Sequence, residues 1–146
     1  ANTHPAEAQA IYALTGGNPL ALKLVTGLVA LFPLPQVLAD LKQSRPGQIE
    51  DVYRHIYWKA WHSLSEEAQR LLQAMPLTGY SGARPPQLLA ISRLSEAQFW
   101  PALQALVTRS LVEVQGTATE RRYGLHALTR TFLQTEIIHW PPHASV

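Results

Sequence analysis

Residues 15–20 read Thr-Gly-Gly-Asn-Pro-Leu and could bring a helix start that favours anions next to a rigid apolar ring. Gly16 and Gly17 can take the left-handed conformation that closes a helix. Asn18 can cap a new helix with its side-chain oxygen, and Pro19 suits the first helical turn because no amide hydrogen is required there. Free amides at a helix start favour anions, and the Pro19 ring could pack against a flat base. The alternative is a plain turn between two helices.

His126 is the second residue whose type and position suit a phosphate. It stands where a predicted short strand, residues 122–125, passes into a predicted helix from His126 to Ile138. Helix amides and an imidazole N–H could donate hydrogen bonds to one anion there, because a neutral imidazole donates one hydrogen bond and a protonated one donates two. A histidine in this place can also be only a helix cap or a packed side chain.

Other chemistries find little support in the residues. The chain holds no cysteine, which excludes disulfides, thiolate metal sites and thiol catalysis. Residues 79–82 lack the spacing and the preceding strand of a nucleophile elbow, and His139 and His143 flank two prolines and cannot share one helix face as zinc ligands do. We therefore predict no catalytic residue and no metal site. With no GxxxxGK[ST] loop and no acidic strand end for magnesium, the chain alone is not expected to be an enzyme.

Composition indicates a globular protein of one compact domain or two small ones, since 47% of the 146 residues are hydrophobic and only 15% are charged. The net charge is only +2 and the cations are scattered, unlike the basic stripe of a nucleic-acid binder. No signal peptide and no membrane-spanning run are evident, so we expect a cytoplasmic protein. Because the chain begins at Ala1 and its one methionine is Met75, we expect a piece of a longer protein.

The first part of the chain, residues 1–46, is predicted to be three helices. They cover residues 5–14, 19–32 and 36–42, and the second is apolar nearly all round, as in the middle of a bundle. Its apolar residues at helical spacing are Leu20, Leu24, Val25, Leu28 and Leu31. The polar segment 43–48, rich in helix breakers, is the predicted domain boundary.

Residues 47–138 are predicted to form a second domain that is helical with a small β-hairpin. An amphipathic helix over residues 49–61 precedes a Ser65-capped helix and a short helix after Pro85-Pro86. Ser95 and Gln98 predict a capping box, and two short strands around residues 115–120 predict a hairpin. Three helices, a hairpin and a closing helix make a winged helix, and residues 139–146 are a predicted tail or linker.

Two stretches together resemble known motifs. Leu14-Thr15-Gly16-Gly17-Asn18-Pro19-Leu20-Ala21-Leu22 resembles the glycine–x–proline motif of STAND-class signalling ATPases, the NB-ARC group of apoptosome and plant disease-resistance proteins. Residues 107–112 and 122–128 are similar to that class's wing and methionine–histidine–aspartate element, with Leu125 and Ala127 in place of methionine and aspartate. The resemblance covers nearly the whole chain, and the second motif rests on His126.

The resemblance implies a nucleotide switch, of which this chain is the helical glycine–x–proline domain (ARC1-like) and the winged-helix domain. Pro19, with Leu20 beside it, would contact the adenine of ADP or ATP, and His126 would reach the β-phosphate of ADP. The phosphate-binding loop and the magnesium site would belong to an upstream P-loop domain, and a sensor or repeat domain would follow. Exchange of ADP for ATP would rotate the winged helix about residues 45–47 and permit self-oligomerisation.

Two alternatives belong to other classes. A winged helix that binds DNA would use residues 95–109 as its recognition helix, but their outward face carries only Arg109 as a cation, and Arg121 and Arg122 follow on the wing. Affinity from phosphate neutralisation grows with the number of cations, so DNA binding is the weaker prediction. A protein-interaction module would use Trp58, Trp100 and Trp140 as anchors.

Overall fold

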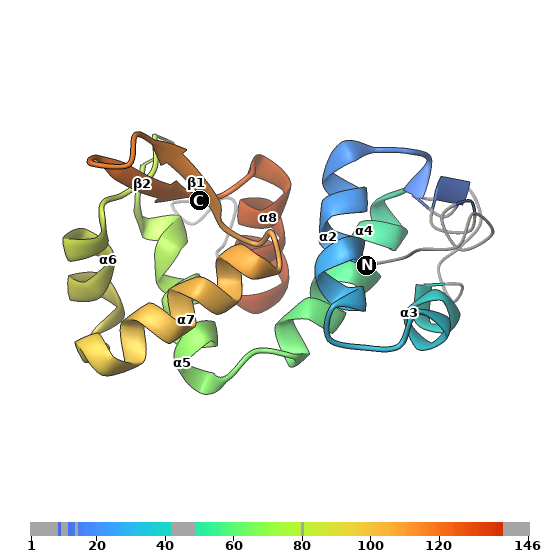
Figure 1. Ribbon diagram of the computed structural model, residues 1–146, viewed down its shortest axis with the longest axis horizontal. Helices are drawn as coiled ribbons and strands as arrows, with labels where there is room; N and C mark the ends of the chain where they lie inside the picture. The colour runs from blue at the N-terminus through green and yellow to red at the C-terminus, as the bar shows by residue number, and fades with distance from the viewer. Residues whose placement is uncertain (1–8, 10–11, 14, 42–48, 80, 139–146) are drawn as a thin grey trace, which may run out of the picture. The chain divides into compact units, whose positions relative to one another are not determined.

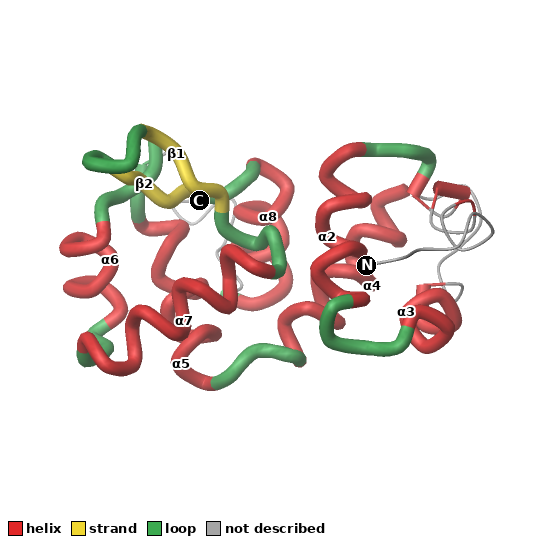
Figure 2. The backbone as a smooth tube through the Cα atoms, viewed as in Figure 1, coloured by secondary structure: helices red, strands yellow, loops and turns green. Residues whose placement is uncertain are grey.

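A computed structural model describes residues 9, 12–13, 15–41, 49–79 and 81–138 of the chain (Figures 1 and 2). The chain divides into two compact units, residues 1–63 and 64–146. Both are mainly helical, and the strands described lie in the second unit. Among the described helices none is both long enough and apolar enough to cross a membrane.

The first unit contains α2 (Pro19–Val29), α3 (Leu34–Leu41) and α4 (Ile49–His62), which pack against one another (Figure 1). α4 follows the predicted amphipathic pattern, because its buried residues recur at three- and four-residue steps. The side chains at the centre of this unit are almost wholly buried and come from all three helices: Leu24, Val25 and Leu28 of α2, Val37 of α3, and Ile56 and Ala60 of α4.

Two helix boundaries in this unit differ from the prediction. α2 ends at Val29 rather than Phe32, and Leu31 is 46% exposed instead of lying in the buried row. Pro33 has no N–H to donate to the Val29 carbonyl and disfavours helical conformation in Phe32, so the helix ends before these residues. The next helix begins at Leu34, two residues before the prediction, because Pro35 is tolerated in a first helical turn. Lys59 of α4 pairs with Asp40 of α3 at 2.5 Å, and its ammonium group lies over the ring of Phe32 in the turn between α2 and α3.

The division between the units falls at Ser63/Leu64, whereas the sequence predicted it at residues 46/47. α4 belongs with the first unit because its apolar face packs on α2 and α3. The predicted hinge at residues 45–47 lies outside the described residues, as do the predicted tail at 139–146 and most of the predicted helix at 5–14.

The second unit contains helices, a 3-10 turn and a two-stranded sheet. In chain order they are α5 (Glu66–Ala74), η1 (Met75–Leu77), α6 (Pro85–Ser92), α7 (Glu96–Thr108), β1 (Glu113–Gly116), β2 (Arg121–Gly124), α8 (Ala127–Phe132) and the π-helical η2 (Leu133–Ile137). α5 packs on α6 and α7, and β2 contacts α6, beside which Figure 2 shows the hairpin. The predicted order of helices, hairpin and closing helix is confirmed.

The core of the second unit is built from all its main helices. Its fully buried large side chains are Leu71 and Leu72 of α5, Met75 of η1, Leu88 of α6, Phe99 and Leu106 of α7, and Leu133 of η2. The strands pair antiparallel with Val114 opposite Tyr123, and Ala83 exchanges two backbone hydrogen bonds with Tyr123 on the other edge of β2. The hairpin is thereby fastened to the segment that leads into α6.

The helix starts of this unit follow their sequence signals. Ser95 accepts a hydrogen bond from the Gln98 amide, and the Gln98 side chain accepts one from the Ser95 amide, so the predicted capping box is confirmed. Ser65 caps α5 through the amide of Ala68, as predicted. α7 continues through Pro101 without a break.

Candidate functional site

The Gly-Gly-Asn-Pro corner has the backbone conformation that its residues predict. Gly16 and Gly17 have φ angles of +66° and +74°, in the left-handed region that side chains with a Cβ disfavour. Asn18 is extended and begins α2, with Pro19 in the first turn. Thr15 supports the corner, because its side chain is buried and its Oγ1 accepts a hydrogen bond from the Gly17 amide at 3.4 Å.

The amides at the start of α2 are engaged within the protein, so the expectation of free anion-binding amides here is wrong. Oδ1 of Asn18 accepts the backbone N–H groups of Leu20 at 3.0 Å and Ala21 at 3.4 Å. Pro19 has no amide hydrogen to offer. The corner therefore presents an apolar ring rather than a nest of donors.

A residue from α4 completes the cap. The Tyr53 hydroxyl donates a hydrogen bond to Oδ1 of Asn18 at 2.6 Å. Burial raises the pKa of Tyr53 above its ordinary value, and a hydrogen bond with the backbone of Ala21 opposes that rise in part. The neutral phenol is the form that can donate, so the burial that raises the pKa also preserves the bond to Asn18.

Pro19 and Leu20 lie together on the surface at the start of α2. Pro19 is exposed and Leu20 is half-buried, while the next residue, Ala21, is completely buried. The Pro19 ring is fixed by its covalent geometry and by the Asn18 cap beside it. An exposed, immobile, apolar ring can pack against a flat aromatic group with little loss of conformational entropy.

His126 caps α8. Its Nδ1 accepts the Leu128 amide at 3.1 Å, and its backbone is extended, as at a helix N-cap. The imidazole is half-buried, at the junction where β2 passes into α8. The interpretation of His126 as a helix cap is therefore correct, and any further role must use the other ring nitrogen.

The cap assigns the tautomer of His126. A nitrogen that accepts a hydrogen bond carries no proton, so a neutral ring with Nδ1 as acceptor holds its proton on Nε2. The Nε2–H is a single donor directed by a ring whose other edge is fixed to the helix. One oriented N–H suits one phosphate oxygen, with no need for a metal.

The predicted site residues thus fall into two groups. Pro19 and Leu20 are neighbours in the first unit, and His126 belongs to the second unit. Among the described residues no group of histidine, aspartate or glutamate side chains could hold a metal ion. Sequence reasoning missed Tyr53, whose only signal was its place on the apolar face of α4; its bond to Asn18 depends on how two helices pack.

The three tryptophans proposed as interaction anchors differ in their surroundings. Trp100 on α7 is 50% exposed, as an anchor requires. Trp58 is half-buried and stacks on His62 with ring centroids 5.4 Å apart, and Trp140 lies outside the described residues.

The DNA-binding alternative gains no support from α7. Glu96, Gln98, Gln104 and Thr108 are exposed, as predicted. Arg109, the cation at the end of the helix, is half-buried and donates to the Ala105 carbonyl at 2.9 Å. Burial lowers the pKa of Arg109 from its ordinary value. The cation is directed back to its own helix. Affinity from phosphate neutralisation grows with the number of cations, so α7 adds no support for DNA binding.

No protein-family model matches the chain, and no curated protein matches it.

Proposed function

We propose that this chain is the helical glycine–x–proline and winged-helix part of a STAND-class nucleotide switch that senses ADP and ATP. The observation that carries the proposal is that Nδ1 of His126 accepts the Leu128 amide, so Nε2 is the ring nitrogen that remains to donate to a phosphate. The exposed Pro19 ring beside a rigid Asn18 cap supports the adenine contact. A helical first unit and a second unit with a hairpin support the proposed order of a helical domain and a hairpin-containing domain, with the division at Ser63/Leu64 instead of residues 46/47.

In the proposed resting state, ADP lies on an upstream P-loop domain that also holds Mg²⁺. Pro19 and Leu20 contact the adenine, and Nε2–H of His126 donates to the β-phosphate. The γ-phosphate of ATP changes these contacts, and the ligand shifts the population toward an open state only by its difference in affinity for the two states. The open state would expose a surface for self-oligomerisation and pass the signal to a downstream sensor or repeat domain, in the cytoplasm. The present chain supplies contacts, not hydrolysis.

The first test is the sequence that precedes residue 1 in the parent polypeptide. The proposal requires a GxxxxGK[ST] loop there. A parent sequence with no phosphate-binding loop would overturn the proposal at once.

The second test is the rate at which the parent protein releases ADP. His126→Asn keeps an oxygen that can cap α8 but removes Nε2–H, and we expect at least roughly tenfold faster ADP release, since a hydrogen bond to a charged group contributes about 1.5–3 kcal/mol. Ser95→Ala is the matched control, because it removes a cap elsewhere in the same unit and should leave the release rate unchanged. An unchanged rate in His126→Asn would refute the sensor role.

A further inference from the structure

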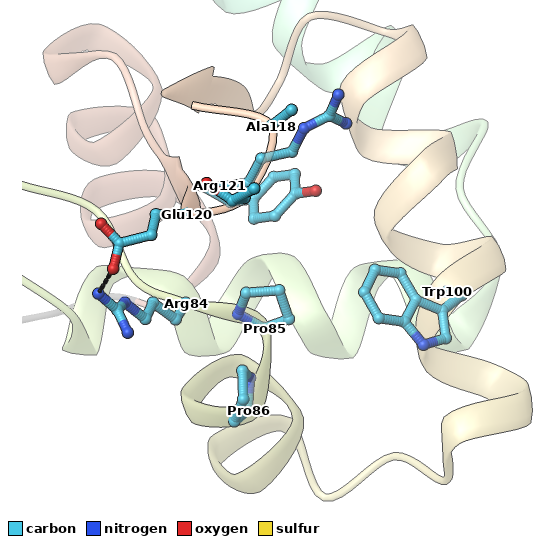
Figure 3. Close-up of a pocket in the computed structure, with 9 residues that line it drawn as sticks. Arg84, Pro85, Pro86, Trp100, Ala118, Glu120 and Arg121 are labelled. Atoms are coloured by element: carbon cyan, nitrogen blue, oxygen red, sulfur yellow. Dashed lines mark hydrogen bonds and ion pairs between the residues drawn. The ribbon is translucent and has the colours of Figure 1, made fainter. Parts of the chain in front are cut away.

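A shallow hollow of about 500 Å³ lies within the second unit, and its lining includes none of Pro19, Leu20 and His126. It is lined by the start of α6, Trp100 in the first half of α7, the turn between β1 and β2, and β2 itself (Figure 3). The charged, aromatic and proline side chains in its lining that matter for binding are those of Arg84, Pro85, Trp100, Glu120, Arg121 and Tyr123.

Trp100 gives the hollow an exposed aromatic surface. The side chain is 50% exposed, although the adjacent Phe99 is 1% exposed. The two rings meet edge to face with centroids 5.0 Å apart, so the buried Phe99 supports the indole from the core side. Figure 3 shows the indole projecting from α7 on the side of Pro85. A large apolar ring that is supported but uncovered is typical of the anchor of a binding surface.

The charged residues of the hollow favour an acidic ligand. Arg84 and Glu120 form an ion pair at 2.8 Å, and both are well exposed, with side-chain exposures of 62% and 67%. Arg121 follows Glu120 in the chain and is exposed too. The hollow therefore carries two guanidinium groups and one carboxylate, and a carboxylate brought by a ligand would balance the excess charge. An exposed ion pair such as Arg84–Glu120 is weak, so it hinders such a ligand little.

We propose that this hollow binds an extended, proline-containing segment of a partner protein that carries an acidic residue beside the prolines. Proline rings in an extended polyproline helix pack flat on exposed aromatic rings and lose little entropy on binding. The rings would lie on Trp100 against Pro85, and the acidic residue would pair with Arg121. This inference does not depend on the proposed nucleotide switch, because it uses none of Pro19, Leu20 and His126.

Two other ligand classes fit the hollow less well. Small organic ligands are usually enclosed over most of their surface, whereas Trp100 and both members of the Arg84–Glu120 pair are open to solvent. Single-stranded nucleic acid could stack on Trp100, but its affinity depends on several cations along the groove. The hollow offers two, one of which already contacts Glu120.

The test is a titration of the whole 146-residue chain, labelled with ¹⁵N, with blocked synthetic peptides. The probe is acetyl-Glu-Pro-Pro-Leu-Pro-Glu-amide, and matched peptides carry lysine for glutamate or alanine for proline. Trp100→Phe identifies the indole signal of Trp100 among the four tryptophans. We expect the acidic proline peptide to shift the Trp100 indole and the Arg121 amide more than either matched peptide does.

Variants separate the two contacts. Trp100→Ala should weaken binding of the acidic peptide roughly tenfold or more, as for an interface anchor, and Trp100→Phe should retain most of it. Arg121→Ala should reduce the preference for the acidic over the lysine peptide by about two- to fivefold, the range for an exposed ion pair. Leu128→Ala, a change at a residue 41% exposed outside the hollow, is the control and should change nothing.

Three results would overturn the proposal. They are no shift of the Trp100 indole at millimolar peptide, equal shifts from the alanine peptide, and larger shifts of the same signals from AMP or a thymidine oligonucleotide. The last result would assign the hollow to a nucleotide ligand. None of these outcomes bears on ADP release by His126 variants, so failure here is distinguishable from failure of the proposed switch.

Discussion

The hydroxyl of Tyr53 on α4 lies 2.6 Å from Oδ1 of Asn18, the side chain that caps α2. One oxygen thus accepts from two backbone amides and from a phenol 35 residues further along the chain. The bond joins the exposed Pro19 corner to the core of the first unit. The corner is held in place because a residue on the buried face of α4 bonds to its cap, and a packing platform for a flat ligand needs such a fixed position.

Removing the Tyr53 hydroxyl should destabilise the first unit modestly. We expect Tyr53→Phe to lower the free energy of unfolding by about 1 kcal/mol, the usual contribution of one hydrogen bond. Asn18→Ala should lower it by about 1–2 kcal/mol, because two helix amides lose their acceptor as well. Urea denaturation of the two variants and of the double variant measures both effects. Because the residues share a bond, the double variant should lose less than the sum; strictly additive losses would show that the bond contributes nothing.

Because its pKa is raised, Tyr53 makes the stability of the folded chain vary with pH in the alkaline range. Burial keeps the phenol protonated in the folded state beyond the ordinary pKa of 10.0 that the unfolded chain has. The folded state then binds more protons than the unfolded state, so stability is fully present below that pH and falls as the pH rises through the folded pKa. We expect wild type to lose its stability advantage over Tyr53→Phe above about pH 10. A difference that stays constant to about pH 11, roughly one unit above the ordinary tyrosine pKa, would contradict this assignment.

The local elements of the chain could be predicted because their signals are local. Asn18, Ser65 and Ser95 cap the helices that their sequence context predicts, and the hairpin follows from the alternation around Gly116. The exposed ring of Pro19 and the cap at His126 are further features that a local pattern could suggest.

Features that depend on packing between distant segments could not be predicted. α4 groups with α2 and α3 because their apolar faces pack together. The polar, breaker-rich segment before α4 instead predicted a domain boundary there. The engaged amides of Leu20 and Ala21, the bond from Tyr53, and the hollow around Trp100 all join residues far apart in sequence or depend on side-chain geometry. No spacing rule reports such contacts.

The two glycines of the corner offer a matched pair of substitutions. Both have positive φ angles, but a Cβ at Gly16 would meet nothing within 4 Å, whereas a Cβ at Gly17 would lie 2.6 Å from the Tyr12 ring. Gly16→Ala should lower stability by roughly 1–2 kcal/mol, the penalty of a left-handed alanine. Gly17→Ala should lower stability by at least as much, and its Cβ should also displace the Tyr12 ring, which is 62% exposed and can move. Thermal unfolding measures the loss of stability, and the NMR signals of Tyr12 report its displacement. A Gly16→Ala variant as stable as wild type would refute the conformational argument.

Arg130 of α8 should be important for the stability of the second unit. Its side chain is buried, and Nη1 donates to the carbonyls of Pro76 at 2.8 Å and Thr78 at 3.2 Å, which joins α8 to η1 and the following turn. Arg130→Met keeps much of the apolar volume but leaves two buried acceptors without that donor. We expect a loss of about 2–4 kcal/mol in urea denaturation, since each buried unsatisfied group costs about 1–3 kcal/mol. Arg122→Met, at an exposed position of β2, is the control and should stay within about 0.5 kcal/mol.

His126 is the residue at which structural and proposed functional roles meet, and three variants separate them. His126→Ala removes the acceptor for the Leu128 amide and should lower the free energy of unfolding by about 1 kcal/mol. His126→Asn supplies a capping oxygen and should restore most of that loss, while His126→Gln, which caps poorly, should behave as alanine does. Chemical denaturation of the three proteins checks this order. If asparagine preserves stability yet speeds ADP release from the parent protein, the cap and the phosphate contact are separate properties of the two ring nitrogens. If both properties follow stability alone, His126 is a helix cap and nothing more.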